Sequence, residues 1–224
     1  MQQGILYIVA TPIGNLEDIT LRALRVLKEV DVVFAEDTRV AKKLLSHYEI
    51  NTNVERLDAN VEKERGGQVV DLLQEGKSVA FISDAGTPGI SDPGSRLVQT
   101  VREASERIEA IPGASSLSAA LSIAGMKSDA FLFLGFLPHK KGRQTALKRI
   151  AESGEAVVLF ESTHRIEKFL KECIEYFPEK RVIVAKELTK IHEEVLSGTA
   201  KEVLQVFSED PQKHKGEFVV IIEE

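Results

Sequence analysis

The sequence alternates short runs of apolar, often β-branched residues with amphipathic stretches whose apolar positions recur every three or four residues. The runs predict strands, and the stretches predict helices with one buried face. Apolar strands separated by helices are typical of a parallel sheet covered on both faces. The first half is therefore predicted to be α/β. Its predicted strands are residues 5–10, 31–36, 54–57, 79–83 and 108–111, and its predicted helices are residues 19–29, 38–48, 62–75 and 95–105.

The alternation is interrupted by Pro112-Gly113 and by the polar stretch 125–129. Ser115 or Ser116 is suited to cap a helix between these two interruptions, because a serine oxygen accepts free N–H groups of a first turn. We predict two α/β domains: residues 1–115 with a parallel sheet and residues 116–224 with a mixed sheet. The remaining predicted strands are 131–136, 156–161, 181–187, 217–222 and a short one near 193–196, and the remaining helices are 142–152, 164–176 and 199–207.

Composition narrows the class of protein. The net charge of −6 over 224 residues excludes a generally basic nucleic-acid binder. The single cysteine, Cys173, excludes an internal disulfide and suits a reducing compartment, so a cytoplasmic location is expected. The longest dense apolar run, residues 131–137, is far shorter than the roughly 20 residues that a helix needs to cross a bilayer, so no membrane partner is expected.

One segment departs from the acidic average. Residues 137–149 contain no acidic residue, and their basic residues are Lys140, Lys141, Arg143, Lys148 and Arg149. A patch of this kind is either a solvated helix face or a surface that contacts a phosphate backbone.

Unusual loops follow three of the predicted strands: residues 11–15, 36–39 and 83–95. In open α/β sheets, ligands bind at the carboxyl ends of strands. Glycine lets a ligand approach the backbone, and helix N-termini offer unpaired N–H groups. These loops therefore predict a site for a polar or anionic ligand. The alternative for any single loop is that its glycines and prolines only form tight turns.

The loop 83–95 matches none of the common ligand motifs. It has no Gly-x4-Gly-Lys-Ser/Thr and no Gly-x-Gly-x-x-Gly, so neither a nucleoside-triphosphate loop nor a common dinucleotide site is indicated. Asp84 and Asp92 lack the spacing of a calcium loop, and the histidines are scattered without a close pair. No metal is expected. The interpretation that remains for this loop is a ligand-binding turn of a less common type.

Together the loops resemble the signature segments of the tetrapyrrole-methylase-like superfamily, in particular its ribosomal RNA small subunit methyltransferase I branch. The resemblance covers nearly the whole chain in the right order. The segments are VATPIGNLEDIT (9–20), AEDTR (35–39), SDAGTPGISDPG (83–94), PGASS (112–116), FLGFLPHKKGR (133–143), FESTHRI (160–166) and KELTKIHEEVLSGT (186–199). Two departures are Ala10, where relatives often have glycine, and the end at Glu224, where relatives commonly continue into a helical extension; without it, weaker RNA binding is expected.

This resemblance implies two α/β domains with S-adenosylmethionine in the cleft between them, in a homodimer. It also implies 2′-O-methylation of a cytidine ribose in 16S ribosomal RNA of the small (30S) subunit. The cofactor-binding positions that it implies are Pro12, Asp84, Ala85, Gly86, Ile90, Ser115, Phe160, Glu161 and Ala185.

Methyl transfer to a ribose hydroxyl gains from a general base that removes its proton. Asp37 and Glu187 are the candidates, because each follows a predicted strand within a recognised segment. The alternative for both is a helix cap or a salt bridge, for example with Arg39. Arg39 itself could contact phosphate or orient the ribose, as could Arg165 and the basic residues of 137–149.

Two further functions stay open. One is a methylase of the same fold that acts on a tetrapyrrole or a protein residue, and the other is a non-catalytic cofactor-binding or ribosome-docking module. The basic segment 137–149 and the long form of the turn 83–94 favour RNA over a small molecule.

Overall fold

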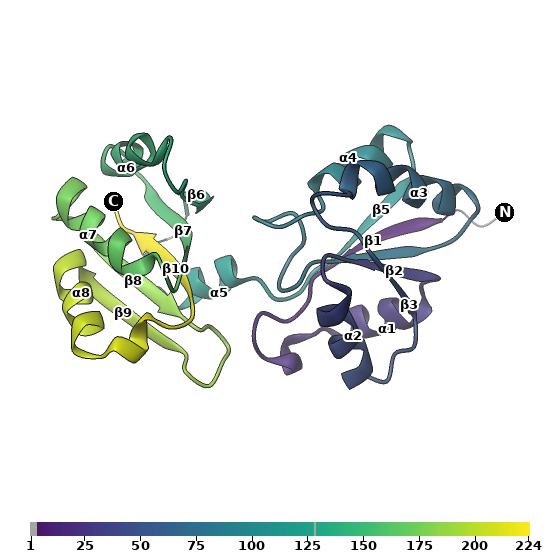
Figure 1. Ribbon diagram of the computed structural model, residues 1–224, viewed down its shortest axis with the longest axis horizontal. Coiled ribbons are helices and arrows are strands. Elements are labelled where there is room, and N and C mark those ends of the chain that lie inside the picture. Colours follow the sequence, from purple (N-terminus) through teal and green to yellow (C-terminus); the bar gives the residue numbers. More distant parts are fainter. Residues whose placement is uncertain (1–3, 128) are drawn as a thin grey trace. The chain divides into compact units, whose positions relative to one another are not determined.

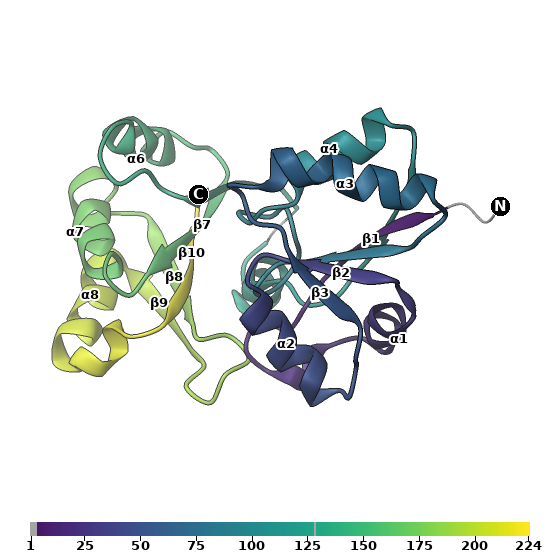
Figure 2. The same cartoon turned by 45° about the vertical axis from the view of Figure 1, so that its right-hand side comes forward.

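The computed structural model describes residues 4–127 and 129–224, and the chain forms two compact units, Met1–Ser115 and Ser116–Glu224. We call them the first and the second unit. Each contains a five-stranded sheet with helices packed against it, as Figures 1 and 2 show. The predicted α/β fold class is confirmed.

The sheet of the first unit is parallel in all its strand pairs, with the order β3-β2-β4-β1-β5. Strand β4 thus lies between β1 and β2, although it follows both in the chain. The strands are β1 (Ile5–Val9), β2 (Val32–Ala35), β3 (Asn53–Arg56), β4 (Val79–Ile82) and β5 (Arg107–Ile111).

Helices cover both faces of this sheet. Successive side chains of each strand point to opposite faces, so each strand can pack against helices on both. Val9 of β1 packs with α1 (Leu21–Glu29) and α2 (Thr38–His47) in one apolar cluster. Leu6 of the same strand packs with α3 (Glu62–Gln74) and α4 (Ser95–Glu103) in another. Both faces of β4 are buried, which explains why its sequence is uninterruptedly apolar.

The second unit has a mixed sheet with the order β6-β7-β10-β8-β9. Strands β6 and β7 run parallel, and the other neighbouring pairs are antiparallel. The strands are β6 (Phe131–Phe136), β7 (Ala156–Ser162), β8 (Arg181–Lys186), β9 (Glu194–Thr199) and β10 (Glu217–Ile222).

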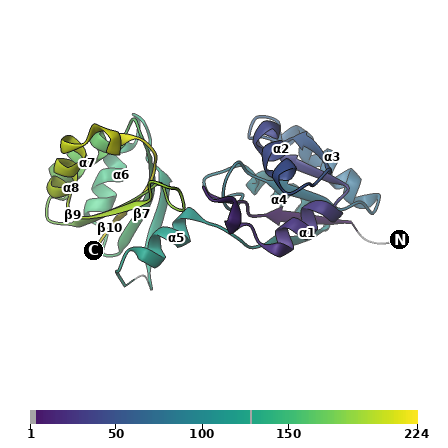
Figure 3. The same ribbon diagram turned by 90° about the horizontal axis from the view of Figure 1, so that it is seen from below.

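Three helices pack against one face of this sheet, and α5 (Ser116–Ile123) lies on the other, as Figure 3 shows. The three are α6 (Arg143–Ala151), α7 (Ile166–Tyr176) and α8 (Ala200–Glu209). Their apolar faces form one core with alternate residues of the strands, among them Val184 and Phe218. None of the helices in the described ranges is both long and apolar enough to cross a membrane.

Strand β9 is longer than the sequence predicts. It pairs with β8 over six positions, from Glu194 to Thr199, although Ser197 and Gly198 do not favour strands. Its backbone hydrogen bonds to β8 outweigh that local preference. Thr199 then caps α8 through a capping box with Glu202, so the strand passes directly into the helix.

Candidate functional site

The loops that the sequence singles out in the first unit meet at the carboxyl edge of its sheet. The chain leaves β1 and β2 towards the face of α1 and α2, but it leaves β4 towards the face of α4. Neighbouring strands whose connections part to opposite faces create a crevice at that edge, and ligands of open α/β sheets bind there. The turn that follows β4, residues 83–94, therefore lies at the topological switch point.

Two backbone hydrogen bonds join this turn to the loop after β1. The Thr11 N–H donates to the Gly86 carbonyl at 2.9 Å, and the Gly86 N–H donates to the Thr11 carbonyl at 3.0 Å. Gly86 has φ +77°, and a Cβ there would lie 3.2 Å from Cγ2 of Ile13. Glycine is thus required by the backbone and by this close approach, not by open space for a ligand.

Other groups of the turn are free for a ligand. Asp84, Ala85 and Ile90 are exposed, and the N–H of Ala85 donates to no acceptor within the described ranges. A hydrogen bond of 3.2 Å from Oγ1 of Thr87 to the Ala114 carbonyl ties the turn to the loop after β5, next to Ser115. The turn therefore presents a main-chain donor and exposed side chains, and hydrogen bonds hold it to the loops after β1 and β5.

A small cavity of about 180 Å³ lies beside the turn. Ligand pockets typically have about 300–1,000 Å³, so this one fits only part of a nucleoside-sized cofactor. Its walls come from the loops after β1 and β4 and from α2. The lining residues are Thr11, Pro12, Leu16, Val40, Ala41, Lys43, Leu44, Ile82, Ser83 and Asp84.

Asp37, one of the two predicted bases, is already engaged. Its carboxylate caps α2 by accepting the Arg39 N–H at 2.8 Å, and it pairs with the Arg39 guanidinium at 2.6 Å. Hydrogen bonds from Arg39 hold the pKa of Asp37 well below its usual range, so this carboxylate accepts a proton poorly. The Asp37 N–H donates to Oδ1 of Asp84 at 3.0 Å, which brings the two loops together.

The neighbouring Glu36 was missed as a candidate. Burial, together with the charges of Asp84 and Asp92, raises the pKa of Glu36 above its ordinary value. Burial also raises the pKa of Asp92. A carboxylate with a raised pKa is the better general base. The signal in the sequence was its position directly after β2, one residue before Asp37.

The strand register separates the predicted site residues of the second unit onto two faces. Phe160, Val219 and Ala185 form one row across β7, β10 and β8. The next row is Glu161, Phe218 and Lys186, and Phe218 belongs to the core beneath α6–α8. Because side chains alternate along a strand, Glu161 points into the helix layer, away from the face of Phe160 and Ala185.

Glu187, the second predicted base, adopts a left-handed backbone with φ +48°. Its Oε1 accepts hydrogen bonds of 2.9 Å from Nζ of Lys190 and from the Glu217 N–H. Burial opposes its ionisation, but these hydrogen bonds outweigh burial and hold the pKa of Glu187 below its ordinary value. A Cβ on Gly216 would lie 2.6 Å from Cγ of Glu187, so this arrangement requires glycine there.

The predicted site residues thus form two groups, one in each unit. Within the described ranges, no three His, Cys, Asp or Glu side chains are placed to hold a metal ion. The first group lies at the carboxyl edge of the first sheet and comprises Pro12, Asp37, Arg39, Asp84, Ala85, Gly86, Ile90 and Ser115. The second comprises Phe160, Ala185 and Glu187 near the ends of β7 and β8, with Glu161 on the opposite face.

The fold and the loops at the switch point are those of a methyltransferase superfamily. The family model of Tetrapyrrole (Corrin/Porphyrin) Methylases matches residues 5–204. Solved structures share the fold: a diphthine synthase with a TM-score of 0.77 at 15% identity, covering 98% of this chain and 90% of that one. A cobalt precorrin-4 methyltransferase has a TM-score of 0.68 at 23% identity, covering 98% and 94%.

Sequence comparison places the chain more narrowly. It is 47% identical to the ribosomal RNA small subunit methyltransferase I of Haemophilus influenzae over 98% of this chain and 78% of that protein. It is 45% identical to the protein of the same name from Borrelia garinii, over 97% and 98%. This chain belongs to the ribosomal RNA small subunit methyltransferase I family, as the sequence segments predicted.

Proposed function

We propose that this protein transfers a methyl group from S-adenosylmethionine to the 2′ oxygen of a cytidine ribose in small-subunit (16S) ribosomal RNA. The observation that carries the proposal is the contrast in identity: 45–47% to the ribosomal RNA methyltransferases named above, against 15–23% to the two solved enzymes. A homodimer in the cytoplasm is part of this proposal.

The first unit supplies a binding place that suits the cofactor. The free N–H of Ala85 can donate to its polar groups, and the exposed Ile90 offers apolar contact. Pro12 lines the small cavity, and Ser115 follows the loop that Thr87 holds. Phe160 and Ala185 remain proposed contacts in the second unit. When bound, the sulfonium supplies an electrophilic methyl group.

The residues of the first unit also suggest how the ribose is prepared. The carboxylate of Glu36 is the group that would accept the 2′-hydroxyl proton, because its pKa is raised while those of Asp37 and Glu187 are lowered. The Arg39 side chain is 86% exposed beyond its pair with Asp37, so its guanidinium can contact the RNA. Holding the two reacting atoms in line supplies the rest of the acceleration.

The test is transfer of a labelled methyl group to small subunits that lack this modification. Label on the ribose of one cytidine, resistant to alkaline cleavage at its 3′ phosphate, is the expected result. Label on a base or on protein, or its absence despite cofactor binding, would refute the ribose assignment. The non-catalytic alternative is excluded if calorimetric titration detects the heat of S-adenosylmethionine binding and the labelled methyl group is also transferred. Light scattering tests the dimer.

A further inference from the structure

We propose that Glu161 is a positioning residue whose buried carboxylate fixes the loop 137–142, and that this loop and α6 form the surface that binds the phosphate backbone of the substrate RNA. The inference rests on the proposed function for its RNA partner. It departs from the sequence expectation that Glu161 lines the cofactor site.

The Glu161 side chain is completely buried, with 0% exposure, between two guanidinium groups. Its Oε1 lies 3.5 Å from Nη2 of Arg143, and its Oε2 lies 3.3 Å from Nε of Arg165. The Ser162 N–H donates to Oε2 at 3.1 Å, but Oε1 has no hydrogen-bond partner in the described ranges. Burial raises the pKa of Glu161, and the charges of Arg165 and Arg143 oppose that rise.

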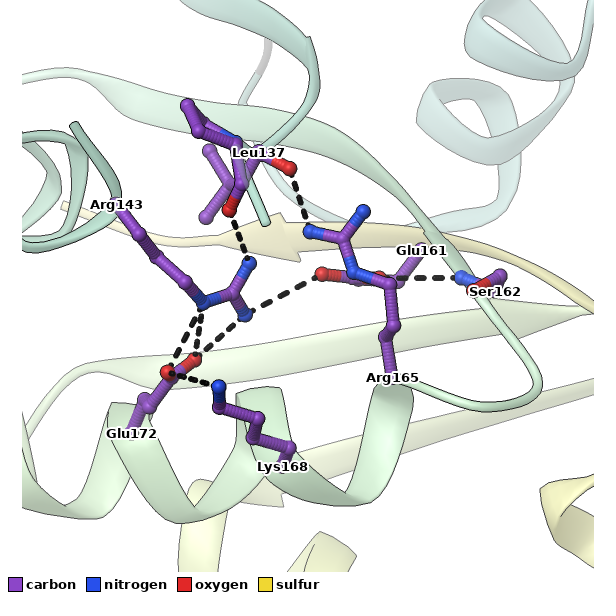
Figure 4. A network of polar contacts seen from close by, with 8 residues as sticks. Leu137, Arg143, Glu161, Ser162, Arg165, Lys168 and Glu172 are labelled. Atoms are coloured by element: carbon purple, nitrogen blue, oxygen red, sulfur yellow. Dashed lines mark hydrogen bonds and ion pairs between the residues drawn. The ribbon is translucent and has the colours of Figure 1, made fainter. Parts of the chain in front are cut away.

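Both arginines use further donors to hold the loop from beneath, as Figure 4 shows. Nη1 of Arg143 donates to the Pro138 carbonyl at 3.1 Å, and Nη2 of Arg165 donates to the Leu137 carbonyl. Two successive carbonyls at the start of the loop are thus bound by two side chains that share Glu161. Loss of the Glu161 charge would leave Arg165 without its carboxylate partner and Arg143 with Glu172 alone.

Arg143 also fixes the helix that follows the loop. Its guanidinium binds Glu172 of α7 with hydrogen bonds of 2.6 and 2.9 Å, which ties the first turn of α6 to α7. Only 6% of its side chain is exposed. Arg143 and the largely buried Arg165 therefore support the surface, and neither is placed to contact phosphate as the sequence suggested.

The loop and α6 present the exposed cations. These are Lys140, Lys141, Lys148 and Arg149, and none of them forms an ion pair with a residue in the described ranges. The neighbouring helix α7 differs, because its Lys168 and Lys171 pair with Glu172 and Glu167. The cations of the loop and α6 therefore remain available to an external anion, whereas those of α7 are partly neutralised.

A hollow of about 550 Å³ lies beside the loop, between residues 139–145 and α7. It gives a backbone phosphate room to approach Lys140 and Lys141 from the side. Cations without internal partners are the ones that can replace the counterions of a polyanion. In a chain of net charge −6, such contact must be local, and residues 140–149 contain four exposed cations and no acidic residue.

The loop surface is tested by the binding of a small-subunit RNA fragment to Lys140→Glu and Lys141→Glu, measured by fluorescence anisotropy at several salt concentrations. Each variant should weaken binding about tenfold and lower the salt slope by about 0.7–0.9. Lys201→Glu on α8 is the matched control, because Lys201 is also exposed and unpaired in the described ranges. Equal loss in the control, or no loss in the loop variants, would overturn the surface.

The anchor is tested without RNA by hydrogen exchange of the 137–143 amides in Glu161→Gln. Exchange there should rise about tenfold or more, while cofactor affinity stays unchanged because the side chain points to the other face. In methyl transfer, KM for RNA should rise with kcat kept at saturating RNA. If Glu161→Gln does not fold, Arg165→Gln tests the same hold on Leu137. Unchanged exchange, or a loss of cofactor affinity, would overturn the anchor.

The outcomes also separate this inference from the proposed function. RNA binding that depends on Lys140 and Lys141 without ribose methylation refutes the function and leaves the surface standing. Ribose methylation that is unchanged by replacement of Lys140 and Lys141 refutes the surface and leaves the function standing.

Discussion

Replacing Gly86 by valine tests whether the turn after β4 is a binding element. At φ +77°, a residue with a Cβ incurs strain of about 1–2 kcal/mol, and valine is worse suited than most. The new side chain also meets Ile13 at 3.2 Å and the Ala114 carbonyl at 3.8 Å, and such overpacking costs about 1–3 kcal/mol. The sum, about 2–5 kcal/mol, is smaller than the stability of most folds, so the fold should survive.

Gly89 offers a matched control in the same turn. It has φ +83°, but a Cβ there meets nothing within 4 Å. Gly89→Val should therefore lose only the backbone strain, about 1–2 kcal/mol in the free energy of unfolding from urea titration. Calorimetry should show no S-adenosylmethionine binding in Gly86→Val and a much smaller loss in Gly89→Val. Unchanged affinity in Gly86→Val would show that the turn only connects β4 to α4. Equal losses of affinity in the two variants would show that the hydrogen-bonded bridge between Gly86 and Thr11 does not support binding.

Two further predictions concern single side chains. A raised pKa means that folded Glu36 binds its proton more tightly than the unfolded chain does, so stability falls as pH rises from the ordinary glutamate pKa through the raised one. Glu36→Gln should therefore melt at a higher temperature than the unchanged protein at pH 7, with this gain vanishing below pH ~4, while kcat drops. Asp92→Asn should also gain stability, but its kcat should be retained. An unchanged kcat in Glu36→Gln would refute the assignment of Glu36 as the base. Thr199→Ala should lower the free energy of unfolding by about 1 kcal/mol, because it removes the capping box of α8, and Thr199→Ser should restore most of it; equal stability of all three proteins would contradict this.

The sequence predicted what depends on local pattern. The apolar run of β4 and the glycines after it were recognisable because burial on two faces and positive φ each restrict the residue types. The engagement of Asp37 by Arg39 was among the alternatives, since a carboxylate before a helix commonly caps it.

What the sequence could not predict depends on contacts between distant segments. Strand order decides that the 83–94 turn lies at the switch point, and no local pattern encodes the insertion of β4 between β1 and β2. Register decides that Glu161 faces the helices while Phe160 faces away. Arg143 reads as one more surface cation in a basic segment, yet it is buried because Glu172 and Glu161 lie beneath it.

The insertion of β4 also sets the order in which the first unit can assemble. β1 and β2 pair with β4 on either side of it and not with each other. A nascent chain that has not yet reached Val79 can therefore form only the β2–β3 pair, and β1 must wait as an apolar strand without a partner. Because β4 pairs with β1 and β2, which lie far before it in the chain, the sheet is rich in non-local contacts, and these slow folding. The segment that completes the ligand edge is thus also the one that joins β1 to the β2–β3 pair.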